Sequence, residues 1–129
     1  MSDTQQPSAE LLAAAEQYGV GNIARHIFLC ADQTEPKCAP RERTLEAWNF
    51  LKRRLQELGL TAGERIVFRT KANCLRMCEQ GPIAVVYPEG TWYHSAMPDV
   101  LERIIQQHLI GGVPLADYVF ATNPLTADE

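Results

Sequence analysis

Two pairs of cysteines, each beside a short apolar run, constrain this 129-residue chain more than any other feature. The first pair follows the run at 27–29, and the second pair precedes the run at 83–87. Apolar runs of this length are typical of buried strands. Two thiol-bearing loops held on a rigid sheet are what a thiolate-ligated metal centre requires. The candidate ligands are Cys30, Cys38, Cys74 and Cys78.

The composition is that of one globular domain. Apolar residues make up 46% of the chain, which is enough to bury a core at this length. No apolar run approaches the roughly 20 residues that span a bilayer. Residues 1–22 lack the basic start and the apolar stretch of a signal peptide. We therefore expect a cytoplasmic protein with no membrane partner, where cysteines more often bind metals or do redox chemistry than form disulfides.

The charge is concentrated at the two ends of the chain. The net charge of −4 argues against general nucleic-acid binding. Residues 1–22 and 112–129 each hold three acidic and no basic residues, so the middle of the chain has 12 basic against 16 − 6 = 10 acidic residues. The expected domain is therefore mildly basic, and its acidic charge lies on the extensions.

Hydrophobic periodicity predicts an α/β layer fold. Large apolar residues recur at helical spacing from Leu45 to Leu58 and again from Val100 to Leu109. The segment 88–91, Pro-Glu-Gly-Thr, separates two short apolar runs as a hairpin turn would. The expected order is strand, helix, three strands and helix. The strands are predicted at 25–29, 66–68, 83–87 and 92–94, and the helices at about 41–58 and 98–110.

Outside these elements the chain divides into two extensions. Residues 1–22 form an N-terminal extension in which Ser8 can cap a short helix over 9–17. That helix could dock on the domain, dock on a second chain, or remain loosely attached. The domain itself is expected at 23–121, and its last part is an ordered arm. Residues 122–129 are expected to form a flexible tail.

The spacing of the cysteines favours an iron–sulfur cluster over two other thiol chemistries. Seven residues separate the first pair and three separate the second. Structural zinc sites usually place the ligands of a pair two to four residues apart, and dithiol reductases use Cys-X-X-Cys. Four thiolates are the usual ligand set of a [2Fe-2S] cluster. Zinc and dithiol chemistry stay open on spacing alone.

Several further stretches resemble one family, the thioredoxin-like [2Fe-2S] ferredoxins. The resemblance covers roughly residues 24–120. It rests on the stretches 26–30, 38–39, 74–78, 81–82, 85–93, 108–109 and 111–112. The resemblance implies a thioredoxin-like α/β fold, with a mixed four- to five-stranded sheet and two main covering helices. It also implies that all four cysteines bind a [2Fe-2S] cluster and that the protein is commonly a homodimer.

The function expected from this reading is one-electron transfer between redox proteins, without enzymatic activity. No dinucleotide-binding G-x-G-x-x-G motif follows a predicted strand. Two alternatives remain: a fixed cluster-bearing subunit of a larger oxidoreductase, or a structural zinc module bound by four cysteines. The redox partners cannot be identified from the sequence. The basic loop residues favour a partner with a partly acidic docking surface; they are Lys37, Arg41, Arg69, Lys71 and Arg76.

The three histidines are not expected to be cluster ligands. A Rieske centre needs two histidines on one iron. His26, His94 and His108 are isolated on strand and helix patterns. We therefore expect each to be a surface residue or a hydrogen-bonded residue of the core.

Overall fold

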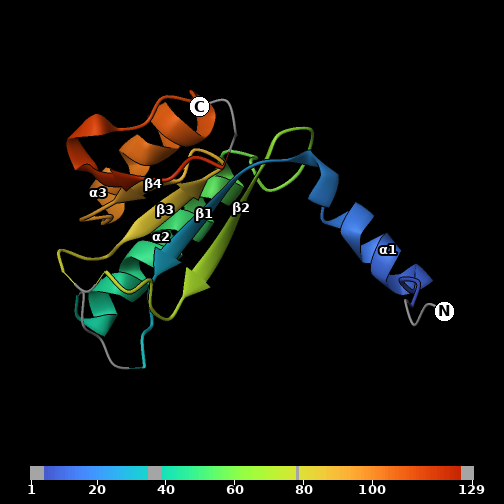
Figure 1. Cartoon of the computed structure of the whole chain (residues 1–129), viewed down its shortest axis with the longest axis horizontal. Helices are drawn as coiled ribbons and strands as arrows, with labels where there is room; N and C mark the ends of the chain where they lie inside the picture. The colour runs from blue at the N-terminus through green and yellow to red at the C-terminus, as the bar shows by residue number, and fades with distance from the viewer. Residues whose placement is uncertain (1–4, 35–38, 78, 126–129) are drawn as a thin grey trace.

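The computed structural model describes residues 5–34, 39–77 and 79–125 of the chain. In this part, helices and strands follow in the order α1 (Ala9–Gln17), η1 (Val20–Asn22), β1 (Ile23–Cys30), α2 (Arg41–Glu57), β2 (Ile66–Ala72), β3 (Ala84–Tyr87), β4 (Thr91–Tyr93), α3 (Pro98–Arg103), η2 (Ile104–Ile110), η3 (Ala116–Tyr118) and β5 (Val119–Thr122). Figure 1 shows these elements along the chain. None of the described helices is both long and apolar enough to cross a membrane.

The strands form one mixed sheet in the order β2-β1-β3-β4-β5. β1 is parallel to β2, and the other neighbouring strands are antiparallel. The sheet confirms the predicted α/β class and the larger of the two expected strand numbers. β1 and β2 are separated in sequence by α2, as the crossover between parallel strands requires.

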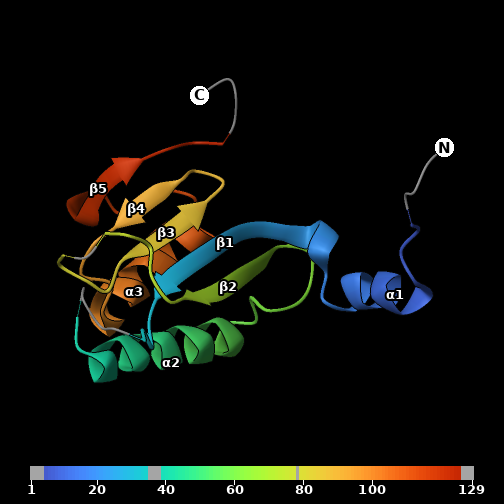
Figure 2. The ribbon, with the colours of Figure 1, turned by 60° about the horizontal axis from the view of Figure 1, so that its bottom comes forward.

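The main helices cover one face of the sheet (Figure 2). Along β1 the side chains alternate, so that Ile27 and Leu29 are fully buried while His26 and Phe28 are partly exposed on the other face. Burial of each such aliphatic side chain contributes about 1.5–3 kcal/mol. The core lies between this face of the sheet and the helices, and α2 supplies Ala47, Trp48, Leu51 and Leu55 to it.

The helix that was predicted from Pro98 begins at that residue but changes its winding. It is α-helical to Arg103 and continues as a π-helix over Ile104–Ile110. Its predicted apolar face is confirmed, because Val100, Leu101, Ile104, Ile105 and Leu109 are all buried. His108 is also fully buried in this turn, which the periodicity did not predict.

The C-terminal part differs from the expectation of a simple ordered arm. Residues 119–122 form an edge strand, β5, that pairs with β4. The backbone continues along the β3–β4 turn, where Asn123 N–H donates to Gly90 O at 2.7 Å and Leu125 N–H donates to Pro88 O at 3.0 Å. A Cβ on Gly90 would clash with the backbone of Asn123, so this approach requires glycine. The strand therefore reaches one residue into the segment predicted as a flexible tail, and residues 126–129 lie outside the described part.

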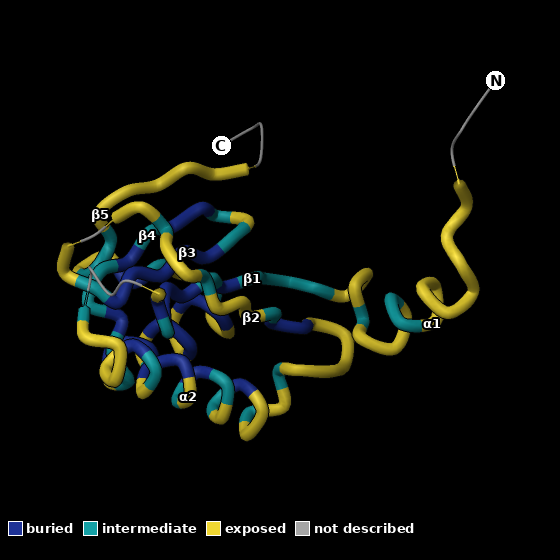
Figure 3. The backbone as a smooth tube through the Cα atoms, turned by 90° about the horizontal axis from the view of Figure 1, so that it is seen from below, coloured by how far each residue is buried: buried dark blue, intermediate teal, exposed yellow. Residues whose placement is uncertain are grey.

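The N-terminal helix forms where it was predicted. Ser8 caps it, and its Oγ accepts the N–H of Leu11 at 3.1 Å. None of the residues of α1 is buried. The helix projects from the end of the sheet as an arm, and Figure 3 shows that most of it is exposed.

Candidate metal centre

The parallel pairing of β1 and β2 brings two of the four predicted ligands to one end of the sheet. Cys30 is the last residue of β1 and pairs with Ala72, the last residue of β2. Cys74 follows two residues later, so both thiols leave the sheet at the carboxyl ends of neighbouring parallel strands. The two cysteine-bearing loops begin at this end of the sheet, where the arrowheads of β1 and β2 point (Figure 1). Residues 44 positions apart in the sequence thus belong to the same region of the fold.

Cys30 lies in an apolar and hydrogen-bonded environment. Its exposed fraction is 1%. The Sγ atom accepts the backbone N–H of Ile83 at 3.0 Å, and the Cys30 N–H donates to the Ile83 carbonyl at the same distance. An amide that donates to sulfur favours the thiolate over the thiol and helps to set the potential of a bound iron–sulfur centre.

Cys74 is the exposed member of the described pair. Its Sγ accepts the backbone N–H of Arg76 at 3.2 Å. Arg76 has a φ of 74°, in the left-handed region, and this local turn directs its amide toward the sulfur. The chain therefore presents one shielded and one solvent-facing sulfur, each with a backbone donor.

Polar side chains join the two cysteine-bearing loops. The Oδ1 of Asn73 accepts the N–H of Thr34 at 3.1 Å, and the Nδ2 of Asn73 donates to Thr34 Oγ1 at 2.9 Å. The N–H of Ala31 also donates to the carbonyl of Ala72 at 3.0 Å and extends the β1–β2 ladder into the loops. These contacts fix the loop after β1 against the loop after β2.

The charges next to these loops are partly balanced. Asp32 accepts Lys71 Nζ at 3.1 Å and Arg41 Nε at 3.3 Å. Arg41 also donates to the carbonyl of Gln33 at 2.7 Å. One carboxylate therefore serves two of the basic residues from which an acidic partner was inferred, so the positive field of this face is weaker than the sequence suggests.

An open pocket of about 340 Å³ lies beside the loop that carries Cys74. Arg76, Met77, Gln80 and Ile83 line it from the loop side, and His94 and Phe120 line it from the β4 and β5 side. Met77 and Phe120 are both exposed. The loop is held by the segment after β4, because Ser95 N–H donates to Gln80 O and Ala96 N–H donates to Pro82 O. The Gly81–Pro82 peptide in this loop is cis.

The other two predicted ligands, Cys38 and Cys78, lie outside the described residues, as does Lys37. Among the residues that the structure does describe, no group of three or more histidine, cysteine, aspartate or glutamate side chains is placed to hold a metal ion. The structure thus brings Cys30 and Cys74 to one end of the sheet, and the complete ligand set stays a prediction.

The histidines have protein partners of their own. His26 Nε2 lies 2.7 Å from Thr70 Oγ1, and burial lowers the pKa of His26. His94 Nδ1 lies 2.9 Å from Ser95 Oγ. His108 is buried within hydrogen-bond distance of Tyr93 and Glu89. These contacts agree with the expectation of surface or hydrogen-bonded core histidines.

A buried polar network behind β4 holds His108. Its Nε2 donates to Glu89 Oε1 at 3.0 Å, because that carboxylate can only accept. Nδ1 is then the acceptor of the neutral ring, and the Tyr93 hydroxyl, 2.7 Å away, donates to it. Tyr93 in turn accepts the Leu115 N–H at 2.9 Å. Arg25 binds Glu89 through two hydrogen bonds of 3.1 and 2.9 Å.

The pKa values of this network follow from its burial. Burial raises the pKa of Tyr93 to about 12 and lowers that of His108 from 6.5, and in His108 it outweighs the opposite effect of Glu89. Burial acts to raise the pKa of Glu89, but the hydrogen bonds from Arg25 and His108 lower it overall. The network therefore contains a neutral histidine and an ionised carboxylate near neutral pH.

The sequence did not reveal the non-cysteine groups of the site. The Ile83 amide is a backbone group, and it reaches Cys30 only because β1 and β3 pair in this register. Asn73 and Thr34 were visible as polar loop residues, but nothing in their spacing indicated that they bind each other. Only the adjacency of Asn73 to Cys74 could have singled it out.

The chain is similar in sequence to characterised [2Fe-2S] proteins, although no family model matches it. A protein of Clostridium pasteurianum described as "Ferredoxin, 2Fe-2S" is 44% identical over 96 residues, which cover 70% of this chain and 90% of that protein. A protein of Aquifex aeolicus with the same description is 28% identical over 102 residues, covering 75% of this chain and 89% of the relative.

Solved structures share the fold. The thioredoxin-like [2Fe-2S] ferredoxin from Aquifex aeolicus superposes with a TM-score of 0.60 at 28% identity, covering 77% of this chain and 92% of that one. A crystal structure of a cysteine-to-serine variant of the same ferredoxin gives a TM-score of 0.63 at 27% identity, covering 75% and 98%. The expectation of a thioredoxin-like fold is therefore confirmed.

Proposed function

The chain belongs to the thioredoxin-like [2Fe-2S] ferredoxins, and from this premise we propose that Cys30, Cys38, Cys74 and Cys78 ligate its cluster. The observation that carries the assignment is the pair of N–H···S bonds, from Ile83 to Cys30 and from Arg76 to Cys74. Sulfurs that accept backbone amides suit the thiolate form in which cysteine binds iron.

The cluster accepts and releases a single electron when it is bound. The residues of this chain supply the rest of the function. The buried Cys30 and the Ile83 amide shield and stabilise negative charge on one side of the site. The solvent-facing Cys74 offers a route toward a partner protein. Asn73 and Thr34 keep the two loops together when the charge of the site changes.

As a ferredoxin the protein is an electron carrier, and its partners are other redox proteins. We propose that it acts as a diffusible carrier, without enzymatic activity of its own, and that it is cytoplasmic. A reducing compartment supports this location, because it keeps thiols available for iron. We also propose a homodimer with the cluster domain at residues 23–121 and residues 1–22 as an extension of it. The partners of the carrier are expected to dock on the surface formed by the loop that contains Cys74 and Met77.

Anaerobic purification followed by iron and sulfide analysis tests the assignment. Two irons and two inorganic sulfides per chain are expected, together with visible absorption that bleaches when one electron is added. One zinc per chain in a colourless protein would contradict the assignment and favour the structural zinc module. Co-purification in a stable complex with a flavin- or nicotinamide-binding subunit would instead show a fixed subunit of a larger oxidoreductase.

A further inference from the structure

The α1 arm presents apolar surface that the described chain does not cover. Leu11 is 61% exposed and Tyr18 is 62% exposed, and α1 contributes no buried residue. A helix of nine residues is marginal in water unless tertiary contacts stabilise it. The arm therefore requires packing from another surface in order to be a stable helix.

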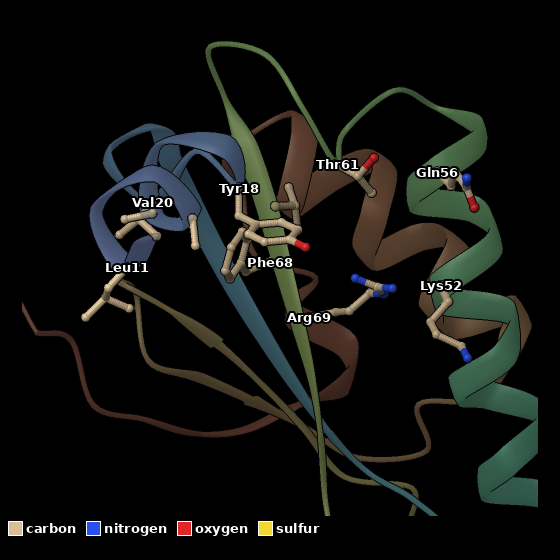
Figure 4. A pocket seen from close by; sticks show the side chains of 11 residues that line it. Leu11, Tyr18, Val20, Lys52, Gln56, Thr61, Phe68 and Arg69 are labelled. Carbon is tan, nitrogen blue, oxygen red and sulfur yellow. The ribbon is translucent and has the colours of Figure 1, made fainter. Parts of the chain in front are cut away.

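One face of the arm borders an open groove. Leu11, Ala14, Ala15 and Tyr18 recur at helical spacing and line a groove of about 700 Å³. Its other walls come from β2, α2 and the loop between them, with Val67, Phe68, Arg69, Lys52, Gln56 and Thr61. Figure 4 shows these side chains around the groove, with Phe68 and Tyr18 at its centre. The groove is a space for side chains that the described residues leave unfilled.

The root of the arm is anchored, so the arm cannot swing to close its own groove. Gly19 has a φ of 71°, and a Cβ at this position would clash with Cδ1 of Ile66 in β2. The side-chain amide of Asn22 donates to the Gly63 carbonyl at 3.1 Å, and the Asn22 N–H donates to Gly19 O at 2.8 Å. These contacts fix the direction in which α1 leaves the domain. The groove must be filled by a different polypeptide.

The charges around the groove suit the arm of a second copy. Lys52 and Arg69 lie over the two sides of the Trp48 region, 5.7 and 5.9 Å from its ring, and both line the groove. Within the described residues neither cation pairs with a carboxylate. Residues 1–22 carry three acidic residues and no basic one. Acidic arm and basic wall are therefore complementary between copies.

We propose that two copies of this chain exchange their N-terminal arms, with α1 of each copy packing into the groove of the other. Each copy has one arm and one groove, so a two-fold axis fills both and the assembly closes as a dimer. The proposal deepens the homodimer proposed above and identifies residues 1–22 as its contact element. It places the Leu11 face of the helix, and not the Leu12 face, in the interface.

Sedimentation equilibrium of the cluster-loaded protein tests the exchange with two adjacent substitutions. Leu11→Glu introduces a carboxylate into the groove-lining face, whereas Leu12→Glu changes a neighbour of similar exposure, 58%, that does not line the groove. The two variants have the same net charge and the same side chain in the same helix. We expect Leu11→Glu to raise the dimer dissociation constant at least about tenfold and Leu12→Glu to leave it within about twofold. The visible spectrum of each variant verifies that the domain is intact.

The other outcomes separate the two proposals. If the wild-type protein is monomeric at all concentrations, both the homodimer and the arm exchange are wrong, while the cluster assignment stands. If the wild type is a dimer that Leu11→Glu does not weaken, the homodimer stands and the exchange is wrong. Equal weakening by Leu11→Glu and Leu12→Glu also overturns the exchange, because the groove then has no special role.

Discussion

Removing one buried hydroxyl, in the variant Tyr93→Phe, isolates the energetic contribution of the network behind β4. Tyr93 is fully buried, so water cannot take the place of its hydroxyl. The hydroxyl accepts the Leu115 N–H at 2.9 Å and donates to His108 Nδ1 at 2.7 Å. Phenylalanine keeps the ring and its packing in the core. The substitution therefore removes two hydrogen bonds and leaves two polar groups without partners.

The expected cost follows from those two groups. A buried donor or acceptor that loses its partner costs about 1–3 kcal/mol. Two of them cost about 2–4 kcal/mol, because the segment around Leu115 can relax to a limited extent. At the Leu115 amide itself, the loss of one bond should accelerate local hydrogen exchange by about 5- to 150-fold. The effect is large compared with a typical surface substitution.

Urea unfolding and amide hydrogen exchange measure the two effects, with Tyr118→Phe as the matched control. Tyr118 packs against the core, and the described residues form no hydrogen bond with its hydroxyl. The control should change the stability by no more than about 0.5 kcal/mol. If Tyr93→Phe resembles the control in both measurements, the hydrogen-bonded network does not stabilise this fold and the reasoning is refuted.

Three further predictions concern pH, the ligands and the loops. Because burial lowers the pKa of His108 from 6.5, the unfolded chain binds more protons below that pH, and stability should fall from about pH 7 to pH 5; His108→Gln should flatten this slope in urea midpoints. Cys74→Ala should abolish cluster assembly, whereas Cys38→Ser should be milder because its loop is longer; equal loss of visible absorption in both would contradict this. Asn73→Ala removes two loop-to-loop hydrogen bonds, about 1–2 kcal/mol, and should speed cluster loss to an iron chelator, an effect absent if the loops are independent.

The sequence by itself determined the local elements. Periodic burial sets helices and strands, so the apolar face of α2 and the start of α3 at Pro98 were predictable within a few residues. The position of each cysteine relative to a strand was equally local, because an apolar run next to a cysteine is visible in the chain. Hydrophobicity also identified the core side of the last helix.

Some features were beyond any local pattern. β5 is short and largely exposed, so it lacks the alternation that predicts a strand and exists because β4 offers it an edge. His108 looks like any polar residue of a helix, yet Tyr93, Glu89 and Leu115 complete a buried network around it from distant segments. The exposure of α1 could not be foreseen either, since a helical pattern does not tell which surface the helix meets.

The meeting of Cys30 and Cys74 at one end of the sheet was likewise decided by the tertiary structure. The register of two parallel strands, Cys30 opposite Ala72, determines that both loops start at the same level. The Ile83 amide reaches sulfur through the antiparallel pairing of β1 with β3. Strand registers depend on packing between segments far apart in the chain, whereas residue patterns record only the burial of each segment.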